Sequence, residues 1–114
     1  MSNVYDSAYQ LEKAIRESQD FLELQKCMDE LQADEEAMKQ FDLFRSVSTS
    51  IQQKQMIGET ISEDEMKKAE EHMARAQQNE KIQKLMAQEQ RLSMMIGEIN
   101  QIIFRPLEEL YRPK

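Results

Sequence analysis

The chain has 114 residues with only two glycines and two prolines, and 32% of its residues are charged, a composition that favours helices and argues against a β fold with many turns. Its formal net charge of -7 argues against direct nucleic-acid binding and against adhesion to an anionic membrane, because both depend on clustered lysines and arginines. A chain of this length has room for one hydrophobic core, so we predict a single all-helical domain over residues 1–114.

The first two helices are predicted over residues 4–17 and 19–32. Apolar residues recur at steps of three and four from Val4 to Ile15, and again from Phe21 to Leu31. Ser18 lies between the two segments, where its hydroxyl can cap the second helix.

A helical hairpin is predicted from the next two segments, over residues 35–57 and 63–78. Asp34 is placed to cap the first of these helices, and Gly58 follows it where a left-handed backbone costs glycine little. Ser62 and Glu65 form the pattern of a capping box at the start of the second. The apolar stripes thin out near the turn, so we expect the hairpin to protrude.

The fifth helix is predicted over residues 80–104. Its apolar residues follow a seven-residue pattern from Ile82 to Ile103, which only Glu89 interrupts. Pro106 is expected to end or kink this helix and to start a short turn over residues 106–111. A break is predicted near residues 77–79, and the alternative is that segments four and five form one long helix.

These elements predict a small bundle of about five helices, and the fifth helix is the most apolar of them. Its apolar residues span more than the stripe of about 100° that one core-facing side of a surface helix shows. We therefore expect a homodimer with an interface in the fifth helix and the residues after Pro106. The alternative is that the tail folds back and covers Ile102 and Ile103. The candidate interface residues are Leu92, Met95, Ile96, Ile99, Ile102, Ile103 and Phe104.

Residues with catalytic or metal-binding chemistry are sparse in this sequence. His72 is the only histidine and lies at no metal-ligand spacing from a cysteine, so we expect a solvated or packing role. Cys27 lies among apolar helix positions, so we expect it to be a small buried apolar residue. We expect no enzymatic activity, catalytic residue, metal or cofactor. A thiol-based redox sensor or small enzyme centred on Cys27 is the alternative.

The sequence also suggests where the protein resides. No apolar run approaches the length of about 20 residues that a membrane-spanning helix needs. The first residues lack the basic and apolar regions of a signal peptide, and a lone cysteine cannot form an internal disulfide. We therefore expect a cytoplasmic protein with no membrane partner.

Four segments of the chain are similar to a known family. Residues 52–59 (QQKQMIGE) resemble the hairpin segment of the YheA-type branch of the YlbF/YmcA superfamily of Gram-positive bacteria. Residues 33–35 leading into 41–45, residues 89–94 and residues 106–111 agree with the same branch, so the resemblance covers nearly the whole chain.

The resemblance implies a compact helical protein that is commonly dimeric and to which no enzymatic activity is assigned. Better-known members of the superfamily act as adaptors that modulate RNase Y-dependent mRNA processing, with effects on competence, sporulation and biofilm formation. Some of their assemblies carry iron–sulfur clusters, but this chain has Cys27 alone and cannot supply the usual four thiolates. The resemblance thus indicates a non-catalytic helical adaptor or regulator and leaves its process and its protein partners open.

Overall fold

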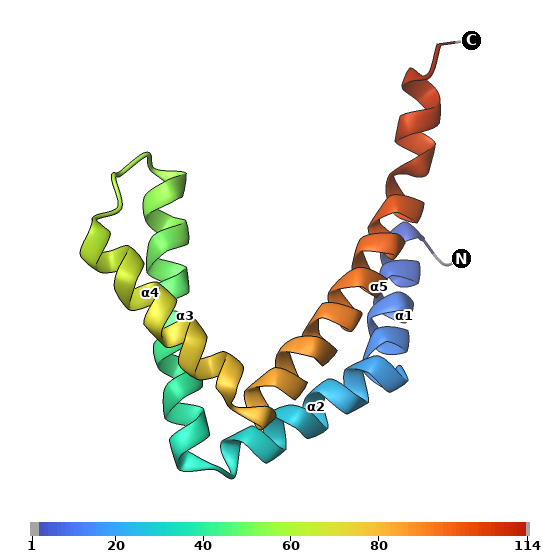
Figure 1. Ribbon diagram of the computed structural model, residues 1–114. Coiled ribbons are helices and arrows are strands. Elements are labelled where there is room, and N and C mark those ends of the chain that lie inside the picture. The colour runs from blue at the N-terminus through green and yellow to red at the C-terminus, as the bar shows by residue number, and fades with distance from the viewer. Residues whose placement is uncertain (1–2, 114) are drawn as a thin grey trace. The chain divides into compact units, whose positions relative to one another are not determined.

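The computed structural model describes residues 3–113, which fold entirely into α-helices joined by short connections (Figure 1). The prediction of an all-α protein with five helices is confirmed. The helices are α1 (Val4–Glu17), α2 (Gln19–Gln32), α3 (Glu35–Met56), α4 (Glu63–Gln78) and α5 (Glu80–Tyr111). Within the described residues, no helix combines the length and apolarity that crossing a membrane requires.

Capping side chains explain where the helices begin. Asp34 Oδ1 accepts a hydrogen bond from the Ala37 amide at 3.1 Å, and Ser62 Oγ accepts one from the Glu65 amide at 3.2 Å. Ser18 Oγ accepts from the Phe21 amide and so starts α2. Each of these bonds satisfies an amide that has no partner within its own helix. The three caps read from the sequence are therefore confirmed.

The turn of the helical hairpin ends α3 at a glycine. Gly58 has a φ of 77°, the left-handed conformation that a side chain would disfavour. The Gly58 amide donates to the Gln55 carbonyl, and the Glu59 amide donates to the Lys54 carbonyl at 2.9 Å. These bonds use carbonyls at the end of α3 that would otherwise lack partners.

Asn79 separates α4 from α5, which answers the question that the sequence left open. Its backbone is extended, so the helix stops at Gln78. Its Oδ1 then accepts from the amides of Lys81 and Ile82 at 3.0 and 3.2 Å, which starts α5. One residue thus ends one helix and caps the next.

The predicted end of the fifth helix near residue 104 is wrong, because α5 continues through Pro106 to Tyr111. The separate turn over residues 106–111 is accordingly part of the helix. Proline removes one helical hydrogen bond and crowds the preceding turn, but it leaves the remaining bonds intact. The residues around Pro106 are helix formers, and a long helix already precedes it.

The described chain forms two compact units. We call Gln25–Met86 the central unit and call the described residues up to Leu24, together with those from Ala87 onward, the terminal unit. Both α2 and α5 contribute residues to each of them.

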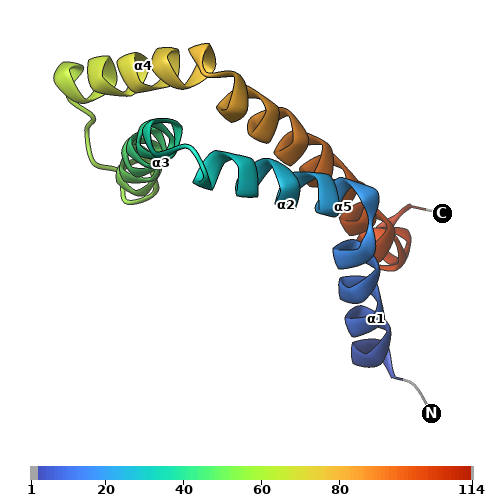
Figure 2. The same cartoon turned by 90° about the horizontal axis from the view of Figure 1, so that it is seen from below.

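The central unit contains the α3–α4 hairpin, whose two helices lie side by side in Figures 1 and 2. Its core lies toward the base of the hairpin, where alanines allow close packing. Phe41 is buried, whereas Phe44 is only half-buried, and Arg45 lies over the Phe41 ring at 5.7 Å from its centre. The buried core residues of this unit are Leu31, Ala37, Phe41, Ala76, Ile82 and Leu85.

Candidate interaction surface

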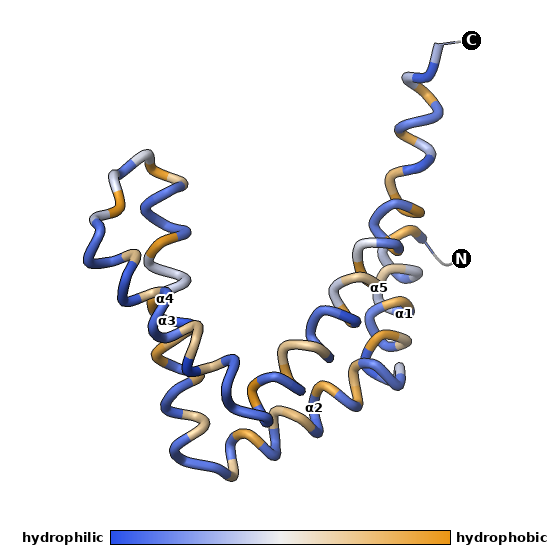
Figure 3. Tube along the Cα trace, in the orientation of Figure 1, coloured by the Kyte–Doolittle hydropathy of each residue, from blue (hydrophilic) through white to orange (hydrophobic). Residues whose placement is uncertain are grey.

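The apolar stripe of α5 is buried near the start of the helix and exposed near its end. Figure 3 shows that hydrophobic positions recur along α5 into its last turns. Along this stripe the exposed fractions are Ile82 0%, Leu85 1%, Leu92 9%, Ile96 38%, Ile103 56% and Leu110 75%. The first residues of the stripe therefore belong to a core, and the last ones face solvent.

The predicted interface residues divide into two groups on this helix. Leu92 is buried, and Met95 and Ile99 are half-buried. The other four are exposed, and they are Ile96, Ile102, Ile103 and Phe104. Since α5 continues as a helix, the tail does not fold back over them, and Leu107, Leu110 and Tyr111 extend the exposed surface.

A second apolar surface in the terminal unit lies on α1. Within residues 4–17 the structure buries no side chain. Val4, Tyr5 and Tyr9 are 83%, 75% and 69% exposed. In Figure 2 the N-terminal half of α1 points away from α5. The strong separation of apolar and polar residues around this helix was the available signal.

Gln88 holds α5 against α2 at the point where the apolar surface of α5 begins. Gln88 Nε2 on α5 donates to the Asp20 carbonyl on α2 at 3.0 Å and approaches its carboxylate at 3.4 Å. The contact lies one turn before Leu92. It therefore anchors α5 just where the apolar stripe begins to emerge into solvent.

The charge on the C-terminal part of α5 differs from that of the chain as a whole. The chain carries a formal net charge of -7. Residues 91–112 contain three arginines and three glutamates, so their formal charges cancel; these are Arg91, Arg105, Arg112, Glu98, Glu108 and Glu109. The most exposed apolar segment is therefore electrically neutral, which lowers the repulsion between this segment and another acidic protein.

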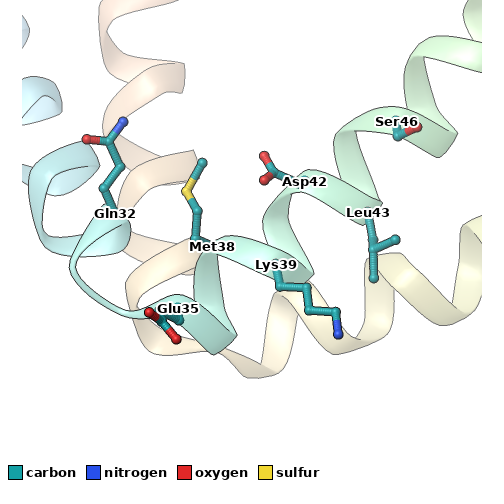
Figure 4. Close-up of a pocket in the computed structure, with 7 residues that line it drawn as sticks. All are labelled: Gln32, Glu35, Met38, Lys39, Asp42, Leu43 and Ser46. Carbon is teal, nitrogen blue, oxygen red and sulfur yellow. The ribbon is translucent and has the colours of Figure 1, made fainter.

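The central unit carries a shallow groove along α3 with a volume of about 540 Å³ (Figure 4). Its lining residues are Gln32, Glu35, Met38, Lys39, Asp42, Leu43 and Ser46. Figure 4 shows that the Lys39 ammonium and the Asp42 carboxylate point to opposite sides of α3. Catalysis needs polar groups that converge on one reacting atom, and these two do not.

Cys27 and His72, the two residues that the sequence considered for catalytic or metal-binding chemistry, lie on different helices. Cys27 is half-buried on α2 with a free thiol, and His72 is half-buried on α4. Within residues 3–113, no group of three or more histidine, cysteine, aspartate or glutamate residues is arranged to hold a metal ion. Glu89, which interrupts the stripe of α5, is exposed and is therefore a solvated residue in this chain.

Two ion pairs brace the central unit and lower the pKa of their carboxyl groups. Lys81 Nζ lies 3.1 Å from Asp34 Oδ2, and Lys54 Nζ lies 2.6 Å from Glu65 Oε1. The hydrogen bond from the Ala37 amide, followed by the one from Lys81, lowers the pKa of Asp34. The hydrogen bond from Lys54 lowers the pKa of Glu65. The sequence predicted that Glu65 would reach back to its own helix cap, but the carboxylate instead joins α4 to α3.

Sequence comparison relates the chain to proteins of bacilli. A family model described as "Control of competence regulator ComK, YlbF/YmcA" matches residues 4–108. The UPF0342 protein YheA of Bacillus subtilis is 52% identical over 109 residues, which cover 96% of this chain and 93% of that protein. A UPF0342 protein of Bacillus pumilus is 48% identical over 109 residues, which cover 96% of this chain and 92% of that protein.

Solved structures show the same fold. A protein of unknown function (DUF964) from Bacillus stearothermophilus is 43% identical, and it superimposes with a TM-score of 0.86 over 96% of both chains. The yheA protein from Bacillus subtilis is 45% identical and superimposes with a TM-score of 0.75, over 96% of this chain and 100% of that one.

Proposed function

The chain belongs to the YlbF/YmcA family, in the YheA-type branch that its sequence predicted, and we propose that it is a non-catalytic helical adaptor or regulatory protein. It acts by presenting apolar helix surface to other proteins, in a pathway related to the competence control for which the family is described. A free Cys27 suits a reducing compartment, so we place this action in the cytoplasm.

The observation that carries the proposal is the amount of apolar surface on α1 and the end of α5. Nine large apolar side chains there are each more than half exposed: Val4, Tyr5, Tyr9, Ile102, Ile103, Phe104, Leu107, Leu110 and Tyr111. At on the order of 100 Å² each, they amount to roughly 900 Å². The largest apolar patch of a typical monomer is about 300–600 Å². The two surfaces together exceed that size, and exposed apolar side chains on two helices of one small chain are typical of a protein that has a partner.

We propose that one such partner is a second copy of the chain. A stable interface buries about 800 Å² on each side, which the exposed apolar surface can supply. A two-fold dimer is the commonest way for a soluble protein to cover such a surface. The neutral segment of α5 lets two acidic chains approach each other there.

Sedimentation equilibrium at micromolar concentration tests the dimer. We expect the mass of two chains for the parent protein and the mass of one chain for Ile103→Asp, because an unpaired carboxylate would be buried at the interface. Gln101→Asp is the matched control, since it puts the same charge two residues away on a polar position of the same helix. A monomer mass for the parent would refute the dimer.

The adaptor role is tested in the native host with the same three proteins. Affinity capture followed by mass spectrometry should recover proteins with the parent and with Gln101→Asp that are absent with Ile103→Asp. Circular dichroism must show equal helicity for all three, so that a loss of partners cannot be attributed to unfolding. Equal recovery of every protein with Ile103→Asp would show that this surface does not carry the function.

A further inference from the structure

The C-terminal half of α5 has two different sides within the terminal unit. The first side carries Leu92, Met95 and Ile99, which are buried or half-buried. The second, which we call the outer seam, is exposed at every position. It consists of Ser93, Ile96, Gly97, Asn100, Ile103, Phe104 and Leu107. These residues recur at steps of three and four, the spacing with which one helix packs along another.

Asn100 lies at the middle of the outer seam, where its amide interrupts an otherwise apolar stretch. Ile96 precedes it by four residues and Phe104 follows it by four, so both lie on the same side of α5. A single asparagine at such a position fixes the register of two paired helices, because its side chain both donates and accepts hydrogen bonds. An amide at a two-fold axis can therefore pair with its own copy.

The two small residues of the outer seam, Ser93 and Gly97, both precede Asn100, with Ile96 between them. The residues that follow Asn100 in the seam are all large, and they are Ile103, Phe104 and Leu107. Gly97 lies in the interior of an exposed helix, where glycine is less favourable than alanine by about 1 kcal/mol. A Cβ built at Gly97 would meet nothing within 4 Å, so the packing of this chain does not require a glycine there. A close approach by another molecule would require it.

We propose that the outer seams of two copies pack antiparallel, with the two-fold axis at Asn100. This register sets Leu107 of one copy against Ser93 of the other and Ile103 against Gly97. Asn100 meets its own counterpart. Leu107 and Ile103 thus face small residues, and Phe104 of one copy packs on Ile96 of the other. A parallel arrangement would instead place Phe104 against Phe104 and Gly97 against Gly97. The neutral charge of residues 91–112 allows this contact between two acidic chains. The inference rests on the proposed homodimer.

Disulfide cross-linking tests the register, with Cys27→Ser as background so that each variant has one thiol. A disulfide needs two Cα atoms within about 7 Å. Asn100→Cys, at the axis, should form a covalent dimer on mild oxidation. Ser93→Cys should not link to the same cysteine in the other copy, and neither should Leu107→Cys. Each position lies seven residues from the axis, so its two copies are separated along the helices by about 21 Å. A mixture of these two variants should cross-link after subunit exchange. Gln101→Cys is the control and should stay monomeric on a non-reducing gel.

Sedimentation and cross-linking together distinguish an incorrect register from the absence of a dimer. If the parent sediments as a dimer and Asn100→Cys does not cross-link, the register is wrong and the proposed homodimer stands. If Ser93→Cys and Leu107→Cys each link to themselves, the helices are parallel. If the parent sediments as a monomer, both proposals are refuted.

A second variant, Gly97→Ala, should favour the helix in the monomer but weaken the dimer. In the monomer it should raise helicity, since alanine is the better helix former. In the dimer the added methyl group should crowd the partner and raise the dissociation constant by about tenfold. An unchanged or lower dissociation constant would overturn the close approach at Gly97.

Discussion

The central and terminal units are both built from amphipathic helices, but they bury their apolar residues very differently. Of the seven apolar residues that are buried within residues 3–113, six lie in the central unit and only Leu92 lies in the terminal unit. The helix α5 runs through both, and its stripe is covered at Leu85 and exposed at Leu110. A hydrophobic stripe therefore indicates that a face will be covered, but it does not indicate whether the cover comes from the same chain.

The largest expected effect contrasts a phenylalanine in each unit. Phe41 is 4% exposed and Phe104 is 54% exposed. In the Ile103→Asp background, which we expect to be monomeric, Phe41→Ala should lower the free energy of unfolding by about 3–5 kcal/mol. Phe104→Ala should lower it by less than about 1 kcal/mol, because little of its ring is buried. Urea denaturation gives both values. Equal losses would mean that the terminal unit has a core of its own.

The next effect concerns the helix end in the terminal unit. Pro106 lies inside α5 and cannot donate a hydrogen bond to the Ile102 carbonyl. Pro106→Ala should stabilise the last turns of α5 by up to about 3 kcal/mol. Hydrogen exchange of the amides at residues 107–111 should slow accordingly, while Pro113→Ala, beyond the helix, should leave them unchanged. If the exchange is already slow in the parent, another contact holds the last turns of α5.

A smaller effect is expected at the boundary between α4 and α5. Asn79 Oδ1 accepts from the amides of Lys81 and Ile82, so Asn79→Ala should cost the central unit about 1 kcal/mol. Gln78→Ala is the matched control, since it changes an exposed neighbour at the end of α4. Urea midpoints compare the two. If both variants lose the same amount, α4 and α5 do not depend on the cap.

The smallest effect is the pH dependence of the ion pair between α3 and α4. The pKa of Glu65 is lowered by Lys54, so the folded state binds its proton less readily than the unfolded state does. The pair should stabilise the central unit above the ordinary glutamate pKa of about 4.3 and lose that contribution as the pH falls through the lower folded value.

Comparison of lysine variants measures this dependence. Lys54→Met should be less stable than the parent at neutral pH, and the difference should shrink in acid. Lys67→Met, at an exposed position on α4, provides the control. A difference that persists unchanged once the carboxyl is protonated would mean that Lys54 stabilises the hairpin by packing and not by charge.

The sequence by itself determined the fold class, the family and most of the helix boundaries. Caps and turns depend on a few neighbouring residues, so Ser18, Asp34, Gly58 and Ser62 could be interpreted without any tertiary information. The seven-residue apolar repeat that starts at Ile82 and Leu85 was also sufficient to predict one long apolar face on the fifth helix.

Tertiary structure decided how those faces are used. Phe41 and Phe44 follow the same periodic pattern, but packing buries only Phe41 fully. Glu65 satisfied a local capping pattern, yet it pairs with a lysine eleven residues away. Pro106 was read as a helix end because local rules omit the support of the long helix that precedes it. The exposure of Ile103 depends on which neighbours lie within reach, and a pattern along one helix contains no information about them.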